Sequence, residues 1–550
     1  MRIDTLWIEK FKNLRNLEIS FEDYLTTVLI GENGTGKSNL LEAIAIIFRD
    51  LDLELKNSDT LQFEYYIEYE CRGRQIKIDA NPNQPRRSVE QKTLFADAQP
   101  SRRKARLLIT VDGKRTSMKE FFENKREYLP NHVFGYYSGP TNRLAQHFEH
   151  HQRLFYDQQR SPDNKGDRPL RPLFFALPVH SQFVLLAFFT FPDEKDRDIL
   201  RDYIGIAELD SVMFIIREPD WARASSSEDP YWGATGLPRE FLRKLFNEAK
   251  APMRRNVRIP LRTGRSTTEE HLYMYFDNVN ALSRVAQREG NTDFQKREFF
   301  KDLDTLFIST LIYEVQISVK RIDSEEVITF TELSEGEQQI LTVLGLLKFT
   351  SDVETLFLLD EPDTYLNPVW KLDFLRLVEP IVGDDTQCQI LLATHDPIVI
   401  GSCVKEQVRV LDFESGKHLG NICWREPAED PQGMGVAALL TSDVYGLRTS
   451  LDWITQNKLD EKRALVAKEP DELSPEEHLI LEKLNSELLD LGFMYSYRDP
   501  MFEEYARLMT LEFEKHPEFK SQTLTKKQQD NREHIAREVI ANVKSKWGRR

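Results

Sequence analysis

The sequence predicts an α/β fold, because buried strands lead directly into short polar motifs. The apolar segment Tyr24–Ile30 runs into a glycine-rich loop, and Asn39–Phe48 follows with apolar residues at helical spacing. A second apolar segment, Thr355–Leu359, ends at Asp360. Short continuous apolar runs indicate buried strands, and the ligands of open α/β sheets bind where such strands end.

Size and composition restrict the class of protein. The chain has 550 residues, 40% hydrophobic and 30% charged, which is ordinary for a globular protein of two or more domains. The formal net charge of −16 argues against a general polyanion-binding protein. The four scattered cysteines, Cys71, Cys388, Cys403 and Cys423, have no CxxC spacing and are expected to be reduced cytosolic thiols without a zinc site.

We expect a cytoplasmic protein without a membrane span. The N-terminus lacks the basic-then-apolar pattern of a signal peptide. Leu173–Phe191 is apolar over nearly the length that a bilayer requires, but Pro178, His180 and Gln182 interrupt it. A buried helix is therefore the better interpretation of this segment.

The segment Gly31–Ser38 has the composition and spacing of a phosphate-binding loop. Glycines allow backbone N–H groups to turn toward phosphate oxygens, and the dipole of the helix that begins near Lys37 favours the same anion. Lys37 is expected to reach the β- and γ-phosphates of ATP, and the Ser38 hydroxyl to ligate Mg²⁺. The candidate ATP-binding residues here are Gly31, Asn33, Gly34, Thr35, Gly36, Lys37, Ser38 and Asn39.

Two carboxylates at the end of the strand Thr355–Leu359 complement this loop. Asp360 is expected to hold Mg²⁺, mostly through water, and Glu361 to orient or deprotonate the water that attacks ATP. The alternative is a buried strand that simply ends in polar residues. A histidine, His395, follows the apolar strand Gln389–Ala393.

Leu333–Gln339, with the sequence LSEGEQQ, lies between the loop and the carboxylates in the chain. On its own it is an ordinary helix start, because Ser334 and Glu337 have the spacing of a capping box. The order of the four motifs resembles that of the ATP-binding-cassette (ABC) ATPases and implies an ABC/RecF-like P-loop ATPase core. In that superfamily this segment of one subunit contacts ATP held by another, so Ser334, Gly336 and Glu337 are expected to bind ATP across a homodimer.

The same resemblance assigns three further segments. Asp363–Pro368 occupies the place of a loop that meets its symmetry mate, and His395 that of the histidine that touches the γ-phosphate. The family also has a glutamine loop after a strand. Val133–Gly139 reads as strand then turn and is the candidate for that place, although its turn has no glutamine and Gln146 comes later.

We therefore divide the chain into four parts. Residues 1–50 begin the ATPase core, 51–310 form an insertion and mainly helical lobe, 311–430 complete the core, and 431–550 form a charged, helical, partner-docking region. The insertion lacks sustained heptads, so no long coiled coil is expected.

The motif sequences narrow the resemblance. Glu361–Pro368 and Ala393–Pro397 are similar to defence-associated ATPases related to RecF, and Tyr445–Leu451 to the ATPase subunits of Septu anti-phage systems (PtuA-like). That family implies a separate HNH nuclease gated by the ATPase, and in retron forms a reverse transcriptase and its msDNA that restrain the effector. A RecF-like DNA repair ATPase is the alternative. A self-contained nuclease of the overcoming-lysogenization-defect (OLD) type is disfavoured, because no Asp-x-Asp follows His395.

Two basic stretches are candidates for contact with nucleic acid. One includes Arg102, Arg103 and Lys104, and the other Arg254, Arg255 and Arg258. Both have the charge to bind phosphate backbones without reading sequence. The alternative is a solvated face or salt bridges between subunits.

Overall fold

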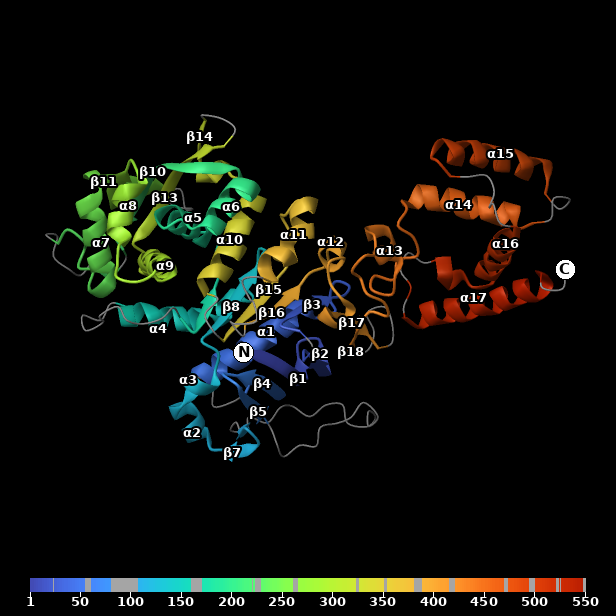
Figure 1. The fold of residues 1–550 in the computed structure, drawn as a ribbon, viewed down its shortest axis with the longest axis horizontal. Coiled ribbons are helices and arrows are strands. Elements are labelled where there is room, and N and C mark those ends of the chain that lie inside the picture. Colours follow the sequence, from blue (N-terminus) through green and yellow to red (C-terminus); the bar gives the residue numbers. More distant parts are fainter. Residues whose placement is uncertain are drawn as a thin grey trace. The chain divides into compact units, whose positions relative to one another are not determined.

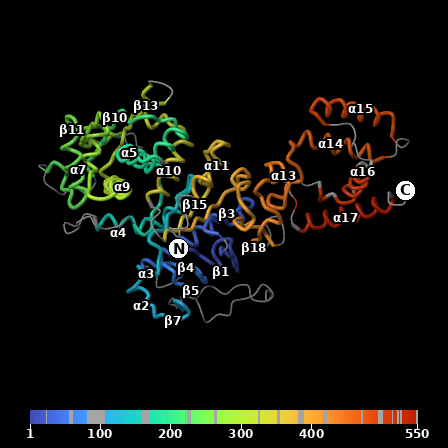
Figure 2. Tube along the Cα trace, viewed as in Figure 1, coloured from blue at the N-terminus to red at the C-terminus, as the bar shows by residue number. Residues whose placement is uncertain are grey.

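The computed structural model describes most of the chain. The described residues are 1–22, 24–54, 61–80, 107–159, 171–219, 221–222, 229–260, 266–322, 326–350, 354–379, 388–414, 421–468, 473–493, 500–520, 524 and 526–547. Contacts divide the chain into two compact units (Figures 1 and 2). Unit 1 comprises Met1–Leu29 and Gly36–Val399, and unit 2 comprises Ile30–Thr35 and Ile400–Arg550.

An antiparallel sheet in unit 1 contains the N-terminal strands. It has the order β2 (Leu14–Ser20), β1 (Arg2–Phe11), β4 (Tyr65–Cys71), β5 (Arg74–Ala80), β6 (Leu107–Val111) and β7 (Lys114–Thr116). Buried and half-buried residues alternate strictly along β4, as expected when one face of a strand packs on a core. The short helices α2 (Met118–Glu123) and α3 (Lys125–Tyr128) follow β7.

A parallel sheet organises the candidate site. Its strands in unit 1 run in the order β3 (Thr26–Ile30), β16 (Gln389–Ala393), β15 (Thr355–Asp360), β8 (His132–Tyr137) and β9 (Leu173–Phe175). All four pairings are parallel, and β3, β15 and β16 are buried along their whole length. Their carboxyl ends therefore share one edge, where α1 (Lys37–Asp52), Asp360 and Thr394 begin the motif segments.

A third sheet and several helices form a lobe of unit 1, drawn from teal to yellow-green in Figure 1. The antiparallel strands are β11 (Lys250–Pro260), β12 (Ser266–Phe276), β10 (Ile206–Arg217), β13 (Ile312–Arg321) and β14 (Val327–Thr329). The helices are α4 (Glu149–Gln159), α5 (His180–Thr190), α6 (Glu194–Asp198), α7 (Gly236–Glu248), α8 (Val279–Ala286) and α9 (Thr292–Ile308). The apolar helix α5 packs on both α9 and α10 (Glu335–Thr350), which carries the LSEGEQQ segment.

The range 51–310 contains more sheet than a mainly helical lobe. β4–β7 extend the N-terminal sheet, β8 and β9 belong to the parallel sheet, and β10–β12 form most of the lobe sheet. Leu173–Phe191 is buried as expected, but only His180–Thr190 of it is helical, since its start forms β9. Among the described helices, none combines the length and the apolar character needed to cross a membrane.

A buried ion cluster fastens helix α10 to the lobe. Lys348, in the last turn of α10, lies 2.6 Å from both Asp193 and Asp196. Lys296 of α9 bonds to the same two carboxylates, at 2.8 Å in the case of Asp193. Asp196 and Lys296 are at most 1% exposed, so each charge depends on the others for compensation.

Unit 2 contains the rest of the chain. The strands β17 (Val408–Phe413) and β18 (Ile422–Arg425) form an antiparallel hairpin. Five helices follow among the described residues: α13 (Val436–Thr441), α14 (Trp453–Val466), α15 (Pro475–Asp490), α16 (Pro500–Lys515) and α17 (Lys526–Trp547). Met509 of α16 and Val539 and Val543 of α17 form a small apolar core. These five α-helices contain most of the described residues after residue 431.

Candidate functional site

The phosphate-binding loop has the backbone that its glycines allow. Gly34 and Gly36 adopt φ of 90° and 92°, values that side chains disfavour. Gly36 is the N-cap of α1, so the first free N–H groups of this helix face the end of the loop. The Thr35 hydroxyl donates a 2.8 Å hydrogen bond to the Glu32 carbonyl and closes the turn.

In unit 2 the start of this loop lies against the C-terminal region. A Cβ atom on Gly31 would lie 2.3 Å from the Leu411 carbonyl oxygen, so only glycine fits there. Gly31 and Glu32 also line a small cavity of about 50 Å³ together with Gly446 and Gln529. The C-terminal segments that follow β18 thus contact the phosphate-binding loop itself.

Lys37, Ser38 and Asp360 come together at the sheet edge. The Ser38 hydroxyl donates a 2.9 Å hydrogen bond to Oδ1 of Asp360. Asp360 is 1% exposed, and burial raises the pKa of its carboxyl. Burial also lowers the pKa of the Lys37 ammonium, an effect opposed by the nearby Glu361 and Asp360 carboxylates. Opposite charges thus compensate each other in a region that largely excludes water.

Glu361 and His395 face each other across the sheet edge. Nδ1 of His395 lies 2.7 Å from Oε2 of Glu361, although the alignment is not that of a hydrogen bond. Glu361 has φ of 55°, a left-handed conformation that costs a non-glycine residue about 1–2 kcal/mol. The Glu361 amide donates to the Ala393 carbonyl at 2.7 Å, which ties the end of β15 to the end of β16.

The loop after Glu361 is held by polar contacts. Thr394 donates a 3.0 Å hydrogen bond to Asp363, whose burial raises the pKa of its carboxyl to about 6. The Thr364 and Ser138 hydroxyls lie 2.9 Å apart, and the Ser138 amide donates to the Asp360 carbonyl at 3.3 Å. The turn after β8 therefore contacts both the strand end and the loop.

An arginine of that turn contacts Asp360. Arg143 donates a 3.0 Å hydrogen bond to Oδ2 of Asp360, and its guanidinium lies 5.1 Å from the centre of the Tyr137 ring. Both carboxylate oxygens of Asp360 are therefore occupied, one by Ser38 and the other by Arg143.

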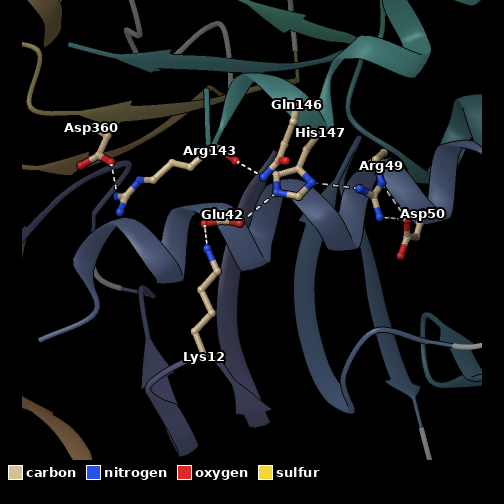
Figure 3. Close-up of polar contacts among 8 residues, drawn as sticks. All are labelled: Lys12, Glu42, Arg49, Asp50, Arg143, Gln146, His147 and Asp360. Carbon is tan, nitrogen blue, oxygen red and sulfur yellow. Dashed lines mark hydrogen bonds and ion pairs between the residues drawn. The ribbon is translucent and has the colours of Figure 1, made fainter. Parts of the chain in front are cut away.

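A chain of polar side chains continues from Arg143 along α1 (Figure 3). Gln146 donates to the Arg143 carbonyl at 2.8 Å. The neighbouring His147 lies 3.0 Å from Glu42 and 2.9 Å from Arg49, both on α1. Glu42, which is 2% exposed, also pairs with Lys12. The segment that carries Arg143 is thus anchored on the helix that carries Lys37.

The LSEGEQQ segment forms the predicted capping box at the start of α10. The Ser334 amide donates to Glu337 at 2.7 Å, and the Glu337 amide donates to the Ser334 hydroxyl at 3.3 Å. Arg321, at the end of β13, donates to Glu337 and to the Ile204 carbonyl, both at 3.2 Å. The lobe therefore holds α10 at both ends, through Arg321 and through Lys348.

Gly336 is required by close packing within its own chain. A Cβ atom there would lie 2.7 Å from the Tyr365 carbonyl oxygen and 3.3 Å from the Trp370 ring. Gln339 accepts a 2.9 Å hydrogen bond from the Tyr365 amide and donates to the Tyr136 hydroxyl at 3.1 Å. The LSEGEQQ segment and the loop 363–368 are therefore packed as one surface.

The structure describes only one of the two basic stretches that were predicted to contact nucleic acid. Arg102, Arg103 and Lys104 lie outside the described residues. Arg254, Arg255 and Arg258 lie exposed on β11, an edge strand of the lobe sheet. Arg254 forms an ion pair with Glu270 at 2.9 Å. The net positive charge of this edge is therefore smaller than the sequence suggests.

The donor set fits Mg²⁺ bound with ATP. The Ser38 hydroxyl and the Asp360 carboxylate supply hard oxygen ligands, and Mg²⁺ takes few protein ligands beside phosphate oxygens. Within the described ranges, no group of three or more His, Cys, Asp or Glu side chains has the arrangement to hold a metal. The side chains at this sheet edge have the chemistry to bind a nucleoside triphosphate and to activate a water molecule beside it.

Sequence reasoning missed several residues of this arrangement. Arg143, His147 and Arg321 belong to no motif, and only the folded sheet brings them to the site. The sequence offered one signal for these residues: Arg143 lies shortly after a predicted strand. Gly336 was singled out for contact with ATP, and its packing against Tyr365 was not foreseen.

Comparison with known families gives two matches. Residues 120–401 match the family described as "AAA domain, putative AbiEii toxin, Type IV TA system", and residues 1–157 match the "AAA ATPase domain" family. The first match spans more than half of the chain.

Curated relatives agree with these matches. The chain is 19% identical to "Retron Vc95 probable ATPase" of Vibrio cholerae, over 75% of this chain and 74% of that protein. It is 26% identical to "Septu protein PtuA" of Bacillus mycoides, over 29% of this chain and 23% of that protein. The SMC head domain of Thermotoga maritima aligns with a TM-score of 0.30 at 12% identity, covering 78% of this chain and 99% of that one. The predicted resemblance to Septu and retron ATPases is confirmed.

Proposed function

The chain belongs to the AAA domain family whose model matches residues 120–401, and we propose that it is the ATP-hydrolysing subunit of an anti-phage defence complex. The observation that carries the ATPase assignment is the Ser38–Asp360 hydrogen bond beside the Glu361–His395 pair. The similarity to retron Vc95 and PtuA proteins supports the defence role.

Each residue of the site has a role in this proposal. The loop glycines and Lys37 bind the phosphates of ATP, while Ser38 and Asp360 would hold Mg²⁺, which would neutralise charge on the phosphates. Glu361 accepts a proton from water as the water oxygen attacks the γ-phosphorus. The bond between that phosphorus and the bridging oxygen breaks, and ADP and phosphate are the products. His395 touches the γ-phosphate.

We extend the proposal to a homodimer with two composite sites. Ser334 and Gly336 of one subunit contact ATP bound by the other, and the start of α10 directs its N–H groups at the γ-phosphate. The packing of Gly336 against Tyr365 supports this idea, because it presents the LSEGEQQ segment and the loop 363–368 on one surface.

A separate HNH nuclease is the proposed partner, docked on residues 431–550. Exposed apolar side chains on the helices of this region support docking. Trp453 is 58% exposed, and Ile454 and Leu479 are each 67% exposed. Such side chains in a soluble complex are expected to be covered by another protein. In a retron form, a reverse transcriptase and its msDNA complete the complex, and the basic edge of β11 contacts that nucleic acid.

This function is tested by expressing the tagged full chain together with the products of its neighbouring genes and purifying the complex. Mass spectrometry that finds an HNH protein in a complex with ATPase activity is the expected result. A reverse transcriptase with DNA–RNA in the same complex identifies the retron form. A homodimer that binds DNA alone, with ATP-dependent affinity, would instead indicate a RecF-like repair ATPase.

A further inference from the structure

Arg143 contacts one oxygen of the carboxylate that is proposed to hold Mg²⁺. Asp360 accepts hydrogen bonds from Ser38 at Oδ1 and from Arg143 at Oδ2. Asp360 is 1% exposed, whereas the Arg143 side chain is 33% exposed. The arginine therefore approaches a buried carboxylate from the solvent side.

The contact supplies a positive charge where Mg²⁺ would supply one. An ionised carboxylate that is buried without a cation is strongly destabilised, and Arg143 adds to the compensation that the nearby Lys37 ammonium gives Asp360. An arginine and a divalent cation beside the same carboxylate would repel each other.

The segment around Arg143 is built to keep the side chain near this place. Gln146 bonds to the Arg143 carbonyl, and His147 is fixed between Glu42 and Arg49 on α1 (Figure 3). The guanidinium also lies over the Tyr137 ring. The backbone is thus anchored on the nucleotide-binding helix, while the side chain is one-third exposed to solvent.

We propose that Arg143 is an exchangeable counter-ion of Asp360. It neutralises this carboxylate while the site lacks metal, and it releases the carboxylate when Mg²⁺ arrives with ATP. The inference rests on the proposed role of Asp360 in metal binding. Arg143 thereby sets the Mg²⁺ concentration at which the site takes up nucleotide, because the metal must overcome the repulsion of the guanidinium.

The test compares wild type with Arg143→Ala by thermal unfolding and by nucleotide binding. In EDTA, Arg143→Ala is expected to have the lower Tm, and Mg²⁺ with a non-hydrolysable ATP analogue should raise its Tm by more than that of wild type. The Mg²⁺ concentration for half-maximal binding of a fluorescent form of that analogue should fall about threefold or more. Arg153→Ala, an exposed arginine on α4, is the matched control and should equal wild type in both assays.

The outcomes separate this inference from the proposed function. A half-maximal Mg²⁺ concentration that is unchanged or raised in Arg143→Ala would overturn the counter-ion role, as would loss of nucleotide binding in this variant, which would indicate direct contact with the nucleotide. If binding to wild type does not depend on Mg²⁺, or if Asp360→Ala keeps that dependence, the metal assignment of Asp360 itself fails.

Discussion

Nδ1 of His395 lies 2.7 Å from Oε2 of Glu361, with the histidine largely exposed and the glutamate mostly buried. The two residues come from different strand ends, β16 and β15, which parallel pairing holds in register. The proposed base and the proposed γ-phosphate contact therefore face each other in this structure. A water that attacks ATP would have to enter between them or be held by both.

Replacement of Glu361 by Gln should separate binding from hydrolysis. The amide keeps the size and much of the hydrogen bonding of the carboxylate, but it cannot accept a proton from water. We expect unchanged ATP affinity and a kcat lower by about 100-fold or more, measured by phosphate release. Equal rates for Glu361→Gln and wild type would refute the assignment of the base.

Replacement of Lys37 by Ala should weaken ATP binding. A charge-assisted contact between ammonium and phosphate contributes about 1.5–3 kcal/mol, which corresponds to roughly 10–100-fold in affinity. Isothermal titration calorimetry measures the change, with Lys10→Ala, an exposed lysine on β1, as the control. ATP affinity that survives intact in Lys37→Ala would contradict the proposed phosphate site.

Replacement of Gly336 by Ala should destabilise the protein before it affects any second subunit. The new methyl group would lie 2.7 Å from the Tyr365 carbonyl oxygen, and overpacking of this kind costs about 1–3 kcal/mol. Gly435→Ala places its methyl group in open space and is the control, with an expected cost of about 0.5–1 kcal/mol because Gly435 is the N-cap of α13. Chemical denaturation compares the two variants, and equal stabilities would show that the packing at Gly336 is relaxed in solution.

Asp363 should make the stability of the protein fall as the pH rises from about 4 to about 6. Burial raises the pKa of Asp363 from 3.8 to about 6, with Glu361 and Asp396 acting in the same direction and Lys371 against it. The folded state therefore holds the proton more tightly than the unfolded state, so the contribution is fully present below the unfolded pKa and is lost above the folded one. Asp363→Asn should remove about 2–3 kcal/mol of this dependence. Unfolding curves of both proteins at pH 4 and pH 7 measure it, and parallel profiles would contradict the raised pKa.

Replacement of Lys296 by Ala should be costly although the residue is far from the nucleotide. Asp196 would keep only Lys348 as a cation partner, and loss of one member of a buried ion cluster costs about 3 kcal/mol. Lys250→Ala removes an exposed lysine that pairs with Asp277 and should leave stability almost unchanged. If the two variants unfold at the same denaturant concentration, the ion cluster does not contribute to the stability of the protein.

The sequence by itself determined the motif residues and the strands that carry them. The runs Thr26–Ile30 and Thr355–Asp360 are buried strands as predicted, because continuous apolar segments can be placed only inside a covered sheet. The glycine loop and the start of α1 also follow from local chemistry, since few other residues tolerate the backbone that Gly34 and Gly36 adopt. The family matches agree with the ATPase core inferred from these motifs.

Only the tertiary structure decided which residues outside the motifs join the site. Arg143 reaches Asp360 because β8 pairs with β15, and the sequence separation of 217 residues conceals that pairing. The neighbours of Gly336 and the cation partners of Asp196 likewise depend on how segments pack, a property that no local pattern encodes. Motifs specify their own conformation and chemistry, whereas the charges that balance them are set by whichever distant segment the fold places beside them.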